Sequence, residues 1–201
     1  DLLETLLTAN LNKEAIVLLE MLQKEEPLCF SLSAIYADLT GTSPNDSATE
    51  GIAFPSRTIE MRSLSNWASQ GNRKAKFQLA CALYGKGHYA DAAALWEEVS
   101  ATDYRSARSL AVAYYSHLNR KEEVLPLLKK ALSLKPNDEQ LIFETVYVMG
   151  KMGVAPTERL SFLNNHKSVI TRDDIMLEWA RAYNMAGQED KALELLKGRD
   201  F

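Results

Sequence analysis

Apolar residues recur every third or fourth position along most of the chain, which is the spacing of amphipathic helices with one buried face. Strand signals are scarce, because Val and Ile do not alternate with polar residues and no Asn-Gly or Asp-Gly hairpin turn is present. The pattern therefore predicts an all-α fold of about twelve helices.

The first 70 residues follow this period less regularly than the rest. We expect helices over 12–26, 27–41 and 56–70, with caps or first residues at Asn12, Pro27, Gly41 and Ser56. Residues 41–55 lie in the only stretch rich in Ser, Thr, Gly and Pro. This composition predicts an irregular connection with one short helix and a break between subdomains.

Residues that interrupt the helical pattern are regularly spaced. Gly87, Asn119, Gly153 and Gly187 are 32, 34 and 34 residues apart, and a fixed period in this range indicates repeated helical hairpins.

Small and large side chains also recur at matching offsets around these turns. We expect the small ones to let helices approach closely and the large ones, such as Trp96 and Leu196, to fill the space between hairpins. A bulky residue at Ala92 or Ala192 should then cost about 1–3 kcal/mol. Because Ala also has the highest helix propensity, helix formation alone is the alternative explanation. The repeated positions are Ala80, Gly87, Ala92, Trp96, Ala131, Pro136, Ala180, Gly187 and Ala192.

These segments resemble the tetratricopeptide repeat, a helix–turn–helix unit of 34 residues. The resemblance implies a right-handed α-solenoid of tetratricopeptide-like hairpins over 56–201, preceded by N-terminal hairpins over 1–40. The third repeat is degenerate, because it keeps Gly153 but few of the small residues. The predicted units lie near 73–104, 105–138, 139–172 and 173–201.

A closer resemblance covers nearly all of the chain. The segments "FPSR" (54–57), "FQLACALYGKGHYADAAALWEE", "RSLAVAYY", "PTERLSFLNNHKSVITRDD" (156–174) and "LKGRDF" are similar to the C-terminal helical region of a family of large bacterial proteins. That family carries an uncharacterised β-rich domain upstream, reminiscent of carbohydrate-active proteins. The resemblance implies that this chain is part of a longer protein.

Composition excludes two classes of partner. The chain is 46% apolar and 25% charged with a net charge of −4, without the clustered basic face that nucleic acid requires. The longest apolar run, 141–150, is too short for a membrane span and contains Glu144. We expect no nucleic-acid partner and no membrane span. Because Asp1 stands where a signal peptide has basic residues, a cytoplasmic location is favoured unless a signal lies outside the fragment.

No group of residues has the spacing of a catalytic or metal site, so we expect no enzyme and no cofactor. His88, His117 and His166 lie in or beside turns and are not paired at i, i+4. Cys29 and Cys81 fall in apolar helical patterns and are predicted to be reduced core cysteines, with a disulfide or a catalytic role as the alternatives.

Two charged motifs are best explained by helix ends. Asp173 and Asp174 precede an apolar helix, where acids act as caps and favour the helix dipole; a glycosidase carboxylate pair would instead need a cleft. Arg57 follows Pro55 closely and is predicted to clamp a helix end or a carboxylate, with ligand contact as the alternative.

The remaining candidate is a surface. In tetratricopeptide folds the first helix of each hairpin lines the concave face, and Arg and aromatic residues there suit an acidic or extended peptide. The alternative is that the aromatic residues belong to the core between repeats. The matching positions are Lys74, Phe77, Tyr84, Arg105, Arg108, Tyr115, Leu177, Arg181 and Asn184.

The sequence supports two hypotheses about function. The first is a non-catalytic module that binds a protein, a peptide or another domain of the same polypeptide. The second, implied by the family resemblance, is an accessory domain that packs against and supports a carbohydrate-active enzyme domain. It predicts exposed apolar side chains on helices within residues 1–50.

Overall fold

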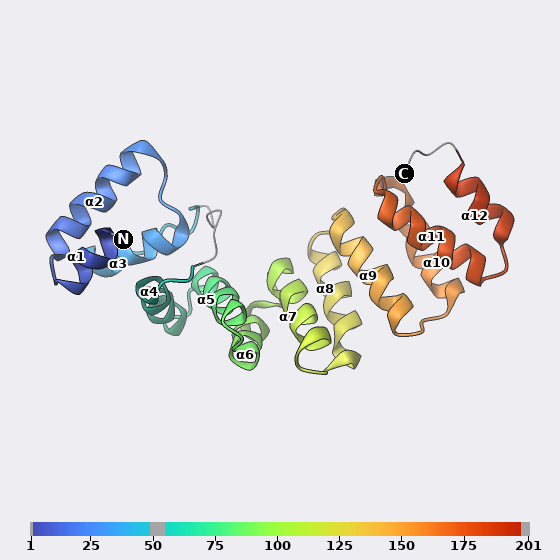
Figure 1. Cartoon of the computed structure of the whole chain (residues 1–201), viewed down its shortest axis with the longest axis horizontal. Coiled ribbons are helices and arrows are strands. Elements are labelled where there is room, and N and C mark those ends of the chain that lie inside the picture. Colours follow the sequence, from blue (N-terminus) through green and yellow to red (C-terminus); the bar gives the residue numbers. More distant parts are fainter. Residues whose placement is uncertain (1, 49–54, 198–201) are drawn as a thin grey trace. The chain divides into compact units, whose positions relative to one another are not determined.

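The computed structural model describes residues 2–48 and 55–197. These residues form twelve α-helices and no strand, which confirms the predicted all-α class (Figure 1). Three parts of the predictions lie outside the described residues: Asp1, positions 49–54 of the connection, and the end of the last repeat at 198–201.

The chain divides into two compact units, residues 1–99 and 100–201. The helices of unit 1 are α1 (Leu2–Thr8), α2 (Asn12–Glu25), α3 (Phe30–Thr40), α4 (Thr58–Ser69), α5 (Arg73–Gly85) and α6 (Tyr89–Val99). Those of unit 2 are α7 (Tyr104–Ser116), α8 (Val124–Leu134), α9 (Glu139–Lys151), α10 (Pro156–Asn165), α11 (Asp173–Met185) and α12 (Glu189–Leu196). Short 3-10 turns at Lys121–Glu123 and Lys167–Val169 precede α8 and α11.

The predicted chain breakers are the turns of the hairpins. Gly87, Asn119, Gly153 and Gly187 all have left-handed backbones, with φ of 85°, 53°, 73° and 69°. Gly reaches this region without steric cost and Asn tolerates it better than other residues. Each therefore ends the first helix of a hairpin and lets the second fold back.

Unit 1 has two apolar clusters. One joins α1, α2 and α3 through Leu3, Leu19 and Ile35. The other packs Phe30 and Ala34 of α3 against Leu64 of α4 and Leu79 of α5. The helices before and after the irregular connection thus share a core.

Unit 2 is built around one cluster to which α7, α8, α9, α10 and α11 all contribute. Its members include Ala107, Ala131, Val146, Leu163 and Trp179. Because this core extends from hairpin to hairpin, it holds the three first helices, α7, α9 and α11, in a fixed arrangement.

The small positions of the repeat are buried as predicted, with one exception. Ala80, Ala92 and Ala131 have no exposed surface, and Trp96 is buried beside them in α6. Ala192 is only half-buried, and α12 buries none of the residues that the structure describes in it. The expectation of a tightly packed Ala192 is therefore wrong: α12 packs chiefly on α11, and the described residues provide no further helix to cover its other side.

Three predicted helix starts are also wrong. Asn12 and Ser56 are not caps, because the N-caps of α2 and α4 are Leu11 and Arg57. Pro27 does not open α3, which begins at Phe30 because Cys29 has an extended backbone. By contrast, Gly41 closes α3 in the left-handed conformation, as predicted.

Within the ranges 2–48 and 55–197, no helix combines the length and apolarity needed to cross a membrane.

Candidate functional site

The outward sides of α7, α9 and α11 form one surface of unit 2, which we call the α7–α9–α11 face. The described part of unit 2 exposes six large hydrophobic residues. Four of them, Val112, Tyr147, Leu177 and Met185, belong to these three helices. Exposed apolar side chains gathered on one surface mark an interaction site more often than scattered ones do.

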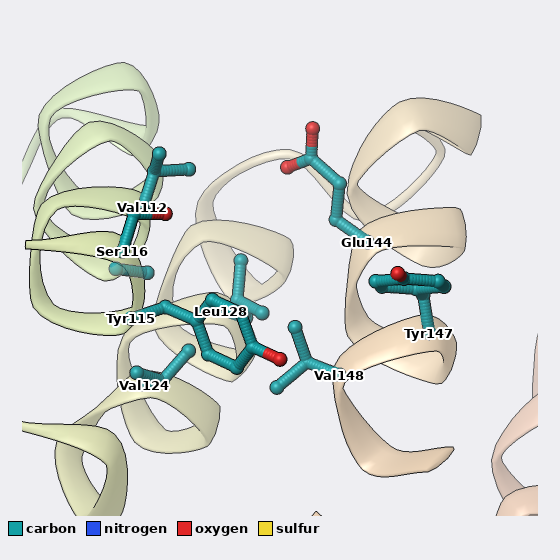
Figure 2. Close-up of a pocket in the computed structure, with 9 residues that line it drawn as sticks. Val112, Tyr115, Ser116, Val124, Leu128, Glu144, Tyr147 and Val148 are labelled. Carbon is teal, nitrogen blue, oxygen red and sulfur yellow. The ribbon is translucent and has the colours of Figure 1, made fainter. Parts of the chain in front are cut away.

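A pocket of about 160 Å³ lies on this face, between α7 and α9 with α8 behind it. Its walls are apolar, formed by Val112 from α7, Val124 and Leu128 from α8, and Val148 from α9. Figure 2 shows the ring of Tyr115 reaching from α7 across the pocket toward Val148.

An ion pair bridges α7 and α9 at one end of the pocket. Arg108 donates to Glu144 through Nε and Nη2, with distances of 2.7 and 2.5 Å to the two carboxylate oxygens. These bonds raise the pKa of the Arg108 guanidinium above its ordinary value. A bidentate pair of this kind fixes the orientation of both side chains.

The same network continues to the start of α11. Gln140 donates to Glu144 at 2.7 Å and accepts from Nη1 of Arg172 at 2.6 Å. Glu139 accepts hydrogen bonds from the backbone N–H groups of Thr171 and Arg172, and the bond from Thr171 is the main cause that lowers the pKa of Glu139. Polar contacts thus hold all three helices of the face together.

A second network lies beneath the face. Arg159 of α10 is only 2% exposed and donates to Glu178 of α11 at 2.8 Å. Glu178 also accepts from Arg181 at 2.5 Å. A Cβ atom at Gly150 would lie 3.1 Å from the Arg159 guanidinium carbon, so the glycine leaves room for this buried side chain.

All six predicted binding residues of unit 2 lie on these three helices. Tyr115 lines the pocket, Arg108 and Arg181 are held by carboxylates, and Leu177 and Asn184 are exposed. Arg105 lies next to Asp103, with 3.2 Å between Nε and the carboxylate.

The three predicted binding residues of unit 1 make contacts within the chain. Lys74 donates to the backbone carbonyls of Asp46 and Ala48, and thereby holds the described part of the connection against α5. Phe77 is buried, and Tyr84 packs on Tyr89 and Trp96 with ring centroids 5.1 and 5.6 Å apart. The alternative that aromatic residues serve the core describes this unit well.

The other candidate residues have structural surroundings. Arg57 donates to the Glu60 carboxylate at 3.0 Å, which is the clamp predicted for it. Asp173 and Asp174 are the first residues of α11, whose N-cap is Arg172, so they favour the helix dipole without capping it.

Both cysteines are free and half-buried, so the prediction of core cysteines is only partly correct. Cys29 is the N-cap of α3, a position that leaves it at the edge of the core. In the part of the chain that the structure describes, His, Cys, Asp and Glu form no group that could hold a metal ion.

Several residues of this site were not selected from the sequence. Val112 and Tyr147 lie 35 residues apart, and Tyr147 lies 34 before Arg181, so the repeat period itself pointed to them. Arg159 and Glu144 carry no such signal, because their partners come from other helices.

Comparison with solved structures supports the fold. The chain superposes on MamA with a TM-score of 0.58 at 17% identity, covering 69% of this chain and 83% of MamA. It superposes on PilF of Pseudomonas aeruginosa with a TM-score of 0.59 at 14% identity, covering 96% of this chain and 85% of PilF. Both are tetratricopeptide-repeat proteins, and the chain has their solenoid fold. No protein-family model matches the chain.

Proposed function

We propose that this chain is a non-catalytic protein-interaction module whose α7–α9–α11 face binds segments of other proteins. One observation carries the proposal: four of the six large hydrophobic residues exposed in the described part of unit 2 lie on this face. Apolar residues next to arginines that are already held in place form the kind of surface from which binding hot spots are built.

The geometry also favours recognition of an extended or helical segment. Three helices side by side offer anchors at regular intervals, and the ion-pair network holds them before a partner arrives. A surface arranged in advance loses less conformational entropy on binding.

Selection of random 12-residue peptides displayed on phage tests this proposal. We expect enriched peptides to bind the wild-type chain and to lose binding to Leu177→Glu. Leu193→Glu is the matched control, because Leu193 is at least as exposed but lies on α12, outside the face. Equal binding to both variants, or no enrichment, would contradict the proposal.

A second candidate function has its own supporting observation. Val17, Met21 and Leu22 of α2 are exposed, and Val17 and Met21 lie one turn apart. We propose, as the alternative, that this surface docks on another domain of a longer polypeptide, such as the carbohydrate-associated domain implied by the family resemblance.

Thermal unfolding of the longer polypeptide tests this alternative. The double change Val17→Lys and Met21→Lys should separate the unfolding of the helical part from that of its neighbour. Sugar binding or hydrolysis should weaken in the same variant. Unchanged unfolding and unchanged activity would rule the alternative out.

A further inference from the structure

The pocket between α7 and α9 has the size and lining of a site for one apolar side chain. Its volume is about 160 Å³, and an apolar cavity of about 150 Å³ in another protein stays dry and binds benzene. Val112, Val124, Leu128 and Val148 supply branched aliphatic walls, which pack well against a branched aliphatic guest.

The rim of the pocket offers polar groups to a peptide backbone. The hydroxyls of Tyr115 and Tyr147 have no hydrogen-bond partner among the residues that the structure describes, and both residues line the pocket. Each hydroxyl can donate to a carbonyl or accept from an N–H group.

The charge at the rim is positive overall. Glu144 is the only carboxylate among the lining residues, and Arg108 neutralises it. Nζ of Lys151 lies 5.2 Å from the centre of the Tyr147 ring, and no described carboxylate is within 4 Å of it. A carboxylate on the partner would therefore complement the side of the pocket formed by Tyr147 and Lys151.

We infer that this pocket takes one branched aliphatic side chain from a partner segment that carries an acidic residue beside it. The inference rests on the proposed function, because it specifies the partner of the same face. Tyr115 and Tyr147 bind the backbone on either side of the aliphatic residue, and Lys151 binds the neighbouring carboxylate.

Fluorescence anisotropy with labelled peptides from the phage selection tests the apolar part. We expect the peptides to share a Leu, Ile or Val next to Asp or Glu. Val112→Trp, which covers the pocket from an exposed position, should weaken binding at least tenfold, as expected for loss of a hot-spot contact. Leu134→Trp is the matched control, because Leu134 and Val112 are both 38% exposed and Leu134 lies outside the pocket.

Charge reversal tests the acidic part. Lys151→Glu should weaken binding of the acidic peptides more than Lys130→Glu, whose residue is exposed on α8. The difference between the two variants should shrink at high salt because exposed charges are screened.

The outcomes separate this inference from the proposed function. Peptides that depend on Leu177 but lack an aliphatic–acidic pair, or that tolerate Val112→Trp, would overturn the inference and leave the function intact. Peptides that bind equally well to Lys151→Glu and Lys130→Glu would remove the acidic neighbour. Failure to select any peptide that depends on the face would overturn both.

Discussion

At the residue scale, one buried arginine replaces a side chain that the degenerate repeat lacks. Gly150 lies three residues before its turn glycine, as Tyr84 does in α5, but has no side chain to pack. The Arg159 guanidinium occupies that space and reaches Glu178 on the next hairpin. The periodic pattern could not reveal this contact, because Arg159 stands at no repeated position.

Arg159→Met should lower the free energy of unfolding by about 3 kcal/mol, because it leaves a buried carboxylate with one cation instead of two. The control is Arg181→Met, which removes the other cation from the same carboxylate. Its side chain is 61% exposed, so the expected loss is below about 1 kcal/mol. Urea denaturation followed by circular dichroism measures both, and equal losses would contradict the assigned role.

The close contact with Gly150 provides an internal check on that result. Gly150→Ala should destabilise the wild type, because the buried Arg159 cannot move away from the new methyl group. In the Arg159→Met background the same change should stabilise by about 0.5–1 kcal/mol, since Ala is the better helix former. The same sign in both backgrounds would argue against the contact.

At the element scale, the repeat period predicted most of the packing. The turns at Gly87, Asn119, Gly153 and Gly187 follow from local backbone chemistry, and the burial of Ala92 follows from its fixed offset. Features that depend on distant partners were not predictable. The ammonium of Lys74 is bound by carbonyls 26 and 28 residues away, which no periodic signal encodes.

Replacing the small residues with Leu tests the packing of the helices. Ala92→Leu should cost about 1–3 kcal/mol, because Ala92 is fully buried. Ala192→Leu should change stability by less than about 0.5 kcal/mol, because α12 leaves this position half-exposed. Urea titrations of the two variants provide the comparison, and a loss at Ala192 as large as that at Ala92 would contradict the packing described for α12.

At the scale of the whole molecule, function follows from what the fold leaves exposed. The chain as a whole is acidic, with a net charge of −4, whereas the binding residues predicted on the α7–α9–α11 face include Arg105, Arg108 and Arg181. The sequence could place those residues on first helices through the repeat offsets. It could not show the pocket, because the pocket depends on how Val112, Leu128 and Val148 of three helices meet.

Methyl NMR of the chain during titration with the tightest peptide from the random library tests the central claim most directly. The account predicts shift changes concentrated at Val112, Val148 and Leu177, with little change at Leu134 and Leu193 on the second helices. Changes confined to α8, α10 and α12, or none at saturating peptide, would contradict the claim that the α7–α9–α11 face binds other proteins.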